Sequence, residues 1–265
     1  MARDPIGAVD YISPMNAVRS LVFFVWMYGL LIVMGLIWLP SLLLPRVVLM
    51  TGIHWYAGLV RWGLRVICGV RTEVRGTEYL PAGAYIYAAK HQCMWDVFMP
   101  FLILPDPVIT MKRELLWYPF FGWYALKTNM IPIDRGGAAK TIKKMLQAAA
   151  GRVKDQRQFV IFPEGTRHPP GRTTGYFSAG TSAFYKRLGV PCVPVATNSG
   201  LCWPAHGIWR RPGLIVYEIL PPIEPGLDRK ALMSQLEGAI EPASDRLLEE
   251  GLEEQGRVRA DLELA

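Results

Sequence analysis

The stretch Ala84-Tyr85-Ile86-Tyr87-Ala88-Ala89-Lys90-His91-Gln92-Cys93-Met94-Trp95-Asp96 decides the fold. Its first part, residues 84–89, is a short apolar run with glycine and proline upstream, which is typical of a buried parallel strand. Residues 95–104 have the pattern of a helix, which we expect Pro100 to bend. His91 therefore lies at the carboxyl end of a strand, where open α/β sheets place their chemistry.

The pairing of His91 with Asp96 suits proton transfer. The unperturbed pKa of a histidine, about 6.5, lets it accept a proton from a hydroxyl at neutral pH, and a carboxylate can fix its tautomer and stabilise the imidazolium. Positions five apart on one helix lie about 140° apart, so these side chains converge only if a turn intervenes and Asp96 stands near the helix start. The alternative is a core histidine beside an unrelated carboxylate at a helix N-terminus, and the pair alone leaves both open.

The chain has 265 residues, enough for one catalytic domain with a full core and an attachment segment, but not for a second large domain. Hydrophobic residues make up 51%, which excludes disorder, and the net charge of +7 favours an anionic partner, whether lipid, phosphorylated substrate or nucleic acid. The cysteines have neither disulfide nor zinc-site spacing, which favours a reducing compartment. They are Cys68, Cys93, Cys192 and Cys202.

An uncharged apolar segment near the N-terminus predicts membrane attachment. Residues 21–39 contain no charged side chain, and apolar residues continue to Leu44. At about 1.5 Å per residue this length suffices for the roughly 30 Å hydrocarbon core, whereas a signal peptide has a shorter apolar core and a small-residue cleavage site. We expect one transmembrane or deeply re-entrant helix, because Gly35 and Pro40 permit a kink or a hairpin.

More arginines follow this segment than precede it. By the positive-inside rule this places the catalytic domain on the cytoplasmic side of the cell inner membrane. Those that follow are Arg46, Arg61, Arg65, Arg71 and Arg75, and those that precede are Arg3 and Arg19. Residues 54–68 place Arg61 and Arg65 one helical turn apart among aromatic and aliphatic residues. This pattern fits a helix lying in the membrane interface, and equally an amphipathic helix packed on the domain.

Further apolar runs predict the remaining elements. Strands are expected at residues 70–75, 108–111, 129–133, 159–162, 192–196 and 214–220. Helices are expected at 138–154 and 179–188, and from 228 onward with an interruption at Pro242. The predicted fold class is α/β, with a mixed, largely parallel sheet flanked by helices and an N-terminal membrane-inserted helical segment. We expect membrane and interfacial helices over 1–69, a catalytic domain over 70–255 and a tail over 256–265.

Residues 115–124 concentrate aromatic side chains beyond what a core usually needs. An aromatic-lined acyl groove or an interfacial patch would account for them. A plain packed helix is the alternative, and the sequence leaves all three open.

A compact charged block, Phe162-Pro163-Glu164-Gly165-Thr166-Arg167, follows directly on a predicted strand. Its glycine lets backbone approach a ligand, and its arginine can bind a phosphate bidentately. Residues 136–141 superficially suggest a nucleotide loop, but they lack the G-x-x-x-x-G-K-[ST] spacing, so we reject that interpretation.

Three blocks now stand in order at separate strand ends. They are His91 with Asp96, Lys112-Arg113 with Ile133-Asp134-Arg135, and Phe162 to Arg167. Together they resemble the glycerolipid acyltransferase family, specifically the 1-acyl-sn-glycerol-3-phosphate acyltransferases. The last block matches that family's third motif in full, and Val193-Pro194-Val195 is similar to its fourth. The resemblance covers roughly residues 70–220.

Two positions depart from the family pattern. Lys90 stands where asparagine is common, and Cys93 stands where serine is common. We expect a lysine next to His91 either to lower the pKa of the histidine, if the two side chains are close, or to contact substrate phosphate.

The resemblance implies transfer of a fatty acyl group from acyl-CoA or acyl-carrier protein to the sn-2 hydroxyl of lysophosphatidic acid, giving phosphatidic acid, with no cofactor and no metal. His91 would be the general base, and Asp96 would orient it. The residues assigned to the acceptor phosphate are Lys112, Arg113, Arg135, Glu164, Gly165, Thr166 and Arg167. The partners would be the acyl donor, the lysophospholipid and the lipid bilayer, with no nucleic acid.

The blocks leave other activities open. They do not distinguish lysophosphatidic acid from a lyso-ornithine lipid, a lysophosphatidylglycerol or a lysocardiolipin. A cysteine hydrolase using Cys93 and His91 is less favoured, since residues two apart rarely converge as nucleophile and base. A non-catalytic membrane adaptor that binds anionic lipid fits the basic charge, although the chain has no recognisable nucleic-acid module. An adaptor would tolerate loss of the His91 imidazole, and an acyltransferase would not.

Overall fold

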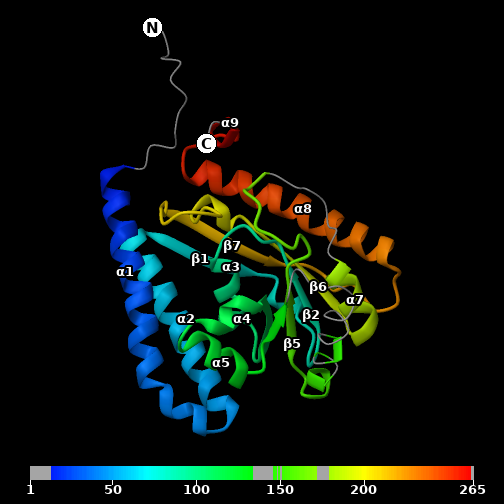
Figure 1. The fold of residues 1–265 in the computed structure, drawn as a ribbon. Coiled ribbons are helices and arrows are strands. Elements are labelled where there is room, and N and C mark those ends of the chain that lie inside the picture. The colour runs from blue at the N-terminus through cyan, green and yellow to red at the C-terminus, as the bar shows by residue number, and fades with distance from the viewer. Residues whose placement is uncertain (1–12, 134–145, 148, 150, 172–178, 264–265) are drawn as a thin grey trace.

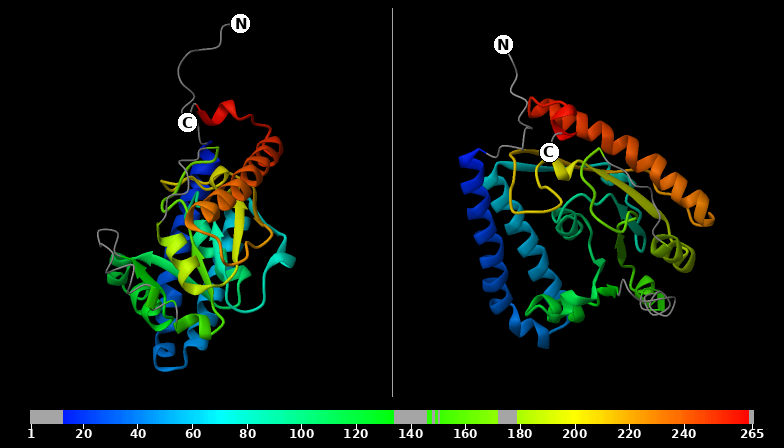
Figure 2. Two further views of the ribbon diagram at one scale, coloured as in Figure 1. Left: turned by 90° about the vertical axis from the view of Figure 1, so that its right-hand side faces the viewer. Right: turned by 45° about the horizontal axis from the view of Figure 1, so that its top comes forward.

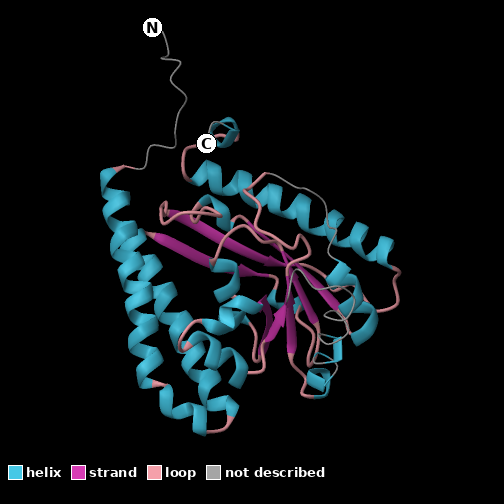
Figure 3. Cartoon of the chain, in the orientation of Figure 1, coloured by secondary structure: helices cyan, strands magenta, loops and turns pink. Residues whose placement is uncertain are grey.

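The computed structural model describes residues 13–133, 146–147, 149, 151–171 and 179–263. Within them one sheet runs in the order β1-β7-β6-β2-β5-β3-β4 (Figures 1 and 3). Its strands are β1 Val70–Arg75, β2 Ile86–Ala89, β3 Pro107–Lys112, β4 Ile131–Ile133, β5 Gln158–Ile161, β6 Cys192–Thr197 and β7 Gly213–Ile219. Every neighbouring pair is parallel except β6 with β7. The predicted mixed, largely parallel α/β sheet is therefore confirmed.

Helices cover both faces of the sheet, because successive side chains of a strand point to opposite faces. On β2, Tyr87 and Ala89 pack into the core that contains the N-terminal half of the chain, whereas Ile86 and Ala88 pack against α7 and α8. The helices of the first face are α1 Pro14–Ile37, α2 Arg46–Cys68, α3 Trp95–Phe98, α4 Pro100–Ile103 and α5 Phe121–Lys127. Those of the second are α7 Ala179–Leu188 and α8 Arg229–Glu254 (Figure 2). Short elements complete the set: η1 Leu39–Leu43, η2 Thr77–Tyr79, η3 Arg113–Trp117, η4 Ser199–Leu201 and α9 Ala260–Glu263.

The helices α1 and α2 form an antiparallel hairpin along one side of the molecule (Figure 1). Glycines allow their close approach. A Cβ added to Gly52 would lie 2.5 Å from the Trp38 ring, and one added to Gly63 would lie 2.4 Å from the Trp26 indole nitrogen. The hairpin ends where Gly69 takes a left-handed conformation (φ 69°) that glycine adopts without steric cost, and the chain turns into β1.

Contacts with the sheet-containing domain hold α1 near both of its ends. The backbone N–H of Arg210 donates to the Ser20 hydroxyl oxygen at 2.8 Å, and the Tyr124 hydroxyl donates to the Gly35 carbonyl. The helix has the length and the mean hydropathy, 2.4, that a membrane span requires. Because both ends touch the domain, α1 lies along it. Its outer apolar side chains are exposed, and they include Val18, Leu21, Val22, Val25, Ile32, Val33, Leu36 and Ile37.

The first turn of α2 is fastened to the domain through Asp106. The Arg46 guanidinium donates two hydrogen bonds of 2.7 Å to this carboxylate, and Arg157 approaches it to 3.1 Å. Arg71 and Arg75 likewise pair with acidic residues of the domain. Three of the arginines counted in the positive-inside argument are thus ion-paired within the protein.

Packing of residues 54–68 on the domain is confirmed, and their location in the membrane interface stays a prediction. Val60 and Leu64 are buried against the domain, whereas Trp55 and Trp62 are exposed. Arg61, which is also exposed, shares the outer face with the two tryptophans. The helix is therefore amphipathic: one face packs on the domain, and the other exposes two tryptophans.

One local prediction is wrong: Pro242 does not interrupt the C-terminal helix, since α8 continues unbroken across it. Proline removes one backbone donor and crowds the preceding turn. Leu236 and Ile240 before it, and Leu247 after it, are buried in the sheet-facing core, so packing on both sides holds the helix straight through. At the predicted bend the helix is divided, because α3 ends at Phe98 and α4 begins at Pro100. Most of the predicted helix 138–154 lies outside the described residues.

Candidate active site

The two strand ends that carry the sequence motifs lie side by side. β2 and β5 pair in parallel, with Ala88 opposite Ile161. His91 follows β2 and Phe162 follows β5, and their rings stack with centroids 4.0 Å apart and planes 17° apart. Parallel pairing therefore brings together two motifs that are about 70 residues apart in sequence.

His91 and Asp96 converge through a tight turn. The distance from His91 Nδ1 to Asp96 Oδ2 is 3.1 Å. Asp96 stands in the first turn of α3, and its Oδ2 also accepts the backbone N–H groups of Gln92 and Cys93 at 2.7 and 2.8 Å. These bonds close the turn that the five-residue spacing requires. Since a carboxylate only accepts, Nδ1 carries the proton and Nε2 is the basic nitrogen.

The second oxygen of Asp96 is held from distant parts of the chain. Oδ1 accepts hydrogen bonds of 2.6 Å from the Ser199 hydroxyl, on η4, and from the Tyr217 hydroxyl, on β7. Burial alone would raise the pKa of Asp96, but the hydrogen bond and charge of His91, with the Cys93 N–H and Ser199, outweigh it, so the pKa is lowered. Asp96 is therefore an ionised carboxylate in a fully buried position.

Glu164 points inward and supports His91. Its side chain is 0% exposed, and its Oε2 accepts the backbone N–H of His91 at 2.8 Å. Burial raises its pKa, although the Lys90 ammonium and this backbone N–H oppose the shift. The family resemblance implied that Glu164 contacts the substrate phosphate. The structure directs its carboxylate away from the groove and toward the backbone that carries the histidine.

Lys90 also points inward, on the opposite side of the strand from His91. Its ammonium lies 2.6 and 2.8 Å from the two oxygens of Glu241 on α8, and 3.3 Å from Glu164. The side chain is buried. The expectation that Lys90 acts on His91 or on a phosphate is therefore wrong, because the alternation of side chains along the strand directs it to the face covered by α8.

Cys93 is not placed as a nucleophile. Its thiol is buried and lies 3.6 Å from Asp96 Oδ1. Burial, and the negative charge of Asp96, raise the pKa of this thiol well above its usual value. A thiol in this state is unreactive, which argues against the cysteine-hydrolase interpretation.

His91 lines a long groove of about 1250 Å³ between the sheet and the N-terminal hairpin. The walls are mainly apolar and come from α1, α2, the α3–α4 segment and β3, with Met34, Leu49, Ile53, Phe98, Phe101 and Met111 among them. Such a groove suits acyl chains. Of the predicted phosphate residues, Lys112, Gly165 and Arg167 line it.

The aromatic segment 115–124 serves two surfaces. Leu115, Tyr118 and Phe121 line the groove, whereas Trp117 (86% exposed) and Trp123 (48% exposed) face outward. The segment therefore lines the groove and also exposes aromatic side chains, so it is not a plain packed helix; acyl binding in the groove and membrane contact through the patch stay predictions.

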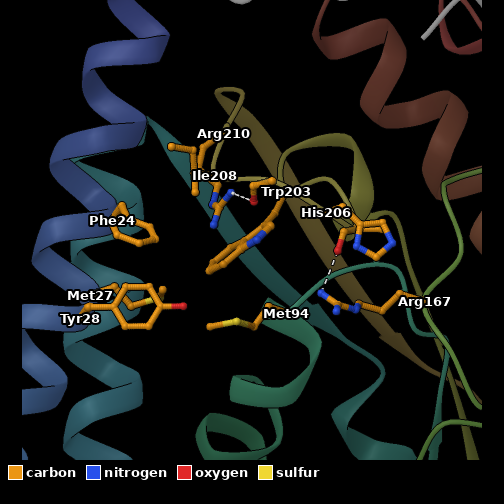
Figure 4. Close-up of a pocket in the computed structure, with 11 residues that line it drawn as sticks. Phe24, Met27, Tyr28, Met94, Arg167, Trp203, His206, Ile208 and Arg210 are labelled. Carbon is orange, nitrogen blue, oxygen red and sulfur yellow. Dashed lines mark hydrogen bonds between the residues drawn. The ribbon is translucent and has the colours of Figure 1, made fainter.

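A second, smaller cavity of about 210 Å³ adjoins the groove (Figure 4). Arg167, Met94, Met27 and Tyr28 line both spaces. Arg167 Nη1 donates to the carbonyl of Ala205 at 2.7 Å, which places its guanidinium at the boundary between them. Arg167 can therefore contact ligand groups on either side.

Among the described residues, the other members of the predicted phosphate set lie at the groove rim or line neither cavity. Lys112 is exposed at the groove rim, with its ammonium 3.5 Å from Glu114. Arg113 and Thr166 are exposed and line neither cavity. Arg135 lies outside the described residues.

Sequence reasoning missed Ser199, Tyr217, Glu241 and Arg210, all of which hold or border the site. None belongs to a local pattern that identifies it. Ser199 and Tyr217 lie 103 and 121 residues from Asp96, and Glu241 lies 151 residues from Lys90. Arg210 comes from a loop that lines the same cavity as Arg167. Val193-Pro194-Val195, the weaker fourth block, lies in β6 directly before the η4 turn that carries Ser199. That block was the available signal for the region.

Comparison with known proteins agrees with this arrangement. The sequence profile described as Acyltransferase matches residues 71–198. The chain is 38% identical over 160 residues to the 1-acyl-sn-glycerol-3-phosphate acyltransferase of Pseudomonas aeruginosa, covering 60% of this chain and 62% of that protein. It is 32% identical to the Escherichia coli protein of the same name, covering 62% of this chain and 64% of that protein. The matched stretch thus spans somewhat less than two thirds of these relatives.

A solved structure extends the likeness of the fold over nearly the whole molecule. The crystal structure of the 1-acyl-sn-glycerophosphate (LPA) acyltransferase PlsC from Thermotoga maritima superposes with a TM-score of 0.71 at 23% identity, covering 89% of this chain and 97% of that chain. The solved structure shows the same fold, and residues 71–198, which match the acyltransferase model, carry the motif geometry described above.

Proposed function

We propose that this protein transfers a fatty acyl group to the sn-2 hydroxyl of lysophosphatidic acid, giving phosphatidic acid. The observation that carries the proposal is the His91–Asp96 pair, with Nδ1 and Oδ2 3.1 Å apart, on the wall of a large apolar groove. The names of the Pseudomonas and Escherichia relatives supply the substrate class. Acyl-CoA and acyl-carrier protein are both suitable thioester donors.

The reaction needs one general base and no covalent acyl-enzyme. Nε2 of His91 removes the proton from the acceptor hydroxyl as its oxygen attacks the thioester carbonyl. Asp96, ionised and fixed, holds the imidazole in the required tautomer and stabilises the imidazolium. The C–S bond then breaks, and the proton on Nε2 passes to the departing thiolate. An ester and a free thiol result.

The groove accounts for the apolar parts of both substrates. A volume of about 1250 Å³ exceeds the usual size of a small-molecule pocket and accommodates long acyl chains. Arg167 lies at its boundary and Lys112 at its rim. We assign to them the anionic groups of the substrates, since guanidinium and ammonium groups bind phosphate strongly.

The N-terminal hairpin attaches the enzyme to the bilayer that supplies the lipid. Residues of α1 and α2 form part of the groove wall, and the outer face of α1 is apolar and exposed. Because α1 is held to the domain near both ends, we propose that the hairpin lies within one leaflet, on the cytoplasmic side of the inner membrane. An acyl chain could then pass from that leaflet into the groove.

The test is product analysis by mass spectrometry. Purified protein is given acyl-CoA, or acyl-carrier protein loaded with the same chain, and an equimolar panel of lysolipids. We expect phosphatidic acid from the wild type and from a matched histidine control, His54→Ala on α2, and none from His91→Ala. Acylation of a different lysolipid would overturn the acceptor assignment, and absence of any product with either donor would overturn the enzyme proposal.

A further inference from the structure

The smaller cavity contains a buried cation for which the described residues provide no acidic partner. Arg210 is 4% exposed and lines this cavity. Its Nη1 donates to the backbone carbonyl of Trp209 at 2.8 Å and makes a long contact of 3.5 Å to that of Gly207. Its Nε has no hydrogen-bond partner within the described part of the chain. The guanidinium also stacks over Trp203, with Cζ 3.6 Å from the ring centroid.

The other buried cations of the described residues are neutralised. Lys90 is bound by Glu241 and Glu164, and Arg157 approaches Asp106 to 3.1 Å. Carbonyl dipoles and an aromatic face compensate Arg210 only in part. Burial lowers the pKa of Arg210 to about 10, so it stays protonated at neutral pH. The positive charge of this guanidinium is therefore only partly compensated, and an anionic ligand can supply the missing negative charge.

A second arginine faces the same cavity. Arg167 Nη1 is held by the Ala205 carbonyl, on the loop that also carries Arg210 (Figure 4). The cavity measures about 210 Å³, far smaller than the acyl groove, and it shares Arg167 and Met94 with that groove. It is thus a small cationic space directly beside the space for acyl chains.

We propose that this cavity is a phosphate subsite in which Arg210 and Arg167 bind a phosphate group of a substrate whose apolar part occupies the groove. The inference rests on the proposed function and adds a specificity-determining residue to it. Two substrates carry such a group: the acceptor, as a phosphate monoester, and the donor, through the phosphates of coenzyme A. The size of the cavity suits a phosphate and its glycerol and not an acyl chain.

The experiment is steady-state kinetics of Arg210→Met beside a matched control, Arg211→Met, which removes the same charge from the next residue. Acceptor concentration is varied at saturating acyl-CoA, and then the reverse. We expect KM for one substrate to rise about tenfold or more in Arg210→Met, with kcat within about twofold of wild type and Arg211→Met unchanged. A raised acceptor KM identifies the acceptor phosphate, and a raised donor KM identifies the phosphates of coenzyme A.

Equal KM values in wild type and Arg210→Met would overturn the subsite. A wild-type enzyme that acylates no lysolipid would instead contradict the proposed function, so the two failures are distinguishable. Arg210→Lys is a second variant that guards against a result caused by misfolding. It keeps the buried positive charge but loses the planar guanidinium that can bind a phosphate through two hydrogen bonds. We expect it to melt near the wild-type temperature and to show an intermediate KM.

A binding measurement that needs no turnover completes the test. Calorimetric titrations with glycerol 3-phosphate and with coenzyme A should both show binding to wild type and Arg211→Met. One of the two ligands should bind at least about tenfold more weakly to Arg210→Met, with Arg210→Lys in between. Identical affinities for all four proteins would contradict the assignment.

Discussion

The Tyr217 hydroxyl donates a hydrogen bond of 2.6 Å to Oδ1 of Asp96, across 121 residues of sequence. Tyr217 lies on β7, beyond the stretch 71–198 that matches the family profile. With Ser199 it occupies the oxygen of Asp96 that does not face His91. The carboxylate that orients the histidine is thus itself oriented by a strand from the far end of the domain.

Removing this hydroxyl should change the pH dependence of catalysis. In Tyr217→Phe the Asp96 carboxylate loses a donor and becomes more basic, so it stabilises the protonated form of His91 more strongly. The acid limb of the kcat/KM profile should move to higher pH, and kcat/KM at neutral pH should fall by about tenfold, equivalent to about 1.4 kcal/mol. The measurement is kcat/KM between pH 5 and 9.

Tyr87→Phe is the matched control for this prediction. The Tyr87 hydroxyl is also buried, but it has no hydrogen-bond partner within the described residues. Its removal should leave the acid limb in place. An unshifted profile in Tyr217→Phe, or equal shifts in the two variants, would show that Tyr217 acts only through packing.

Lys90→Met should destabilise the fold strongly. The substitution leaves Glu164 and Glu241 facing each other without the buried ammonium that binds both. Breaking a buried ion pair by removing one partner costs about 3–5 kcal/mol, whereas Lys186→Met on the exposed surface of α7 should change stability by less than about 0.5 kcal/mol. Urea unfolding followed by tryptophan fluorescence measures both. A cost below about 1 kcal/mol for Lys90→Met would mean that the triad is not a buried charge network.

Asp96 should contribute stability that is present at neutral pH and lost only in acid. Its pKa is lowered in the folded protein, so its stabilising effect is complete above the unfolded value of about 3.9 and disappears as pH falls through the folded value. We expect Asp96→Asn to be less stable than wild type by about 2 kcal/mol or more at pH 7. That difference should stay constant down to about pH 5 and shrink below about pH 4. A difference that grows on acidification would contradict the assigned direction.

A charge on the outer face of α1 should weaken membrane binding. Val25 is 70% exposed on the apolar face of the hairpin. A charged side chain placed in hydrocarbon costs about 2.5–3.5 kcal/mol, so Val25→Glu should lower vesicle affinity by about tenfold or more. The measurement is flotation with vesicles that contain anionic lipid. Tyr79→Glu, which changes a 41% exposed residue on η2, is the control and should float like wild type. Equal flotation of both variants would contradict membrane contact through α1.

Local chemistry made much of the fold predictable. The buried runs around Tyr87, Val160 and Val195 form central strands because each is too apolar for any exposed element. The motifs end these strands, and parallel pairing alone then brings His91 and Arg167 to one groove.

What the sequence could not supply depended on side-chain direction and on long-range packing. Lys90 looks like a ligand-binding residue in the sequence, yet strand alternation turns it toward Glu241 on α8. Tyr217 belongs to a strand that has no motif, and its role follows only from its pairing beside β6. Pro242 breaks a helix by local rules, but the buried residues around it override them.

The most direct test of the central claim is the rate of acyl transfer to lysophosphatidic acid by His91→Ala, measured beside His54→Ala in proteins of equal melting temperature. We expect kcat/KM of His91→Ala to fall by about 10²-fold or more while that of His54→Ala stays near wild type. Phosphatidic acid formed by His91→Ala at the wild-type rate would contradict it.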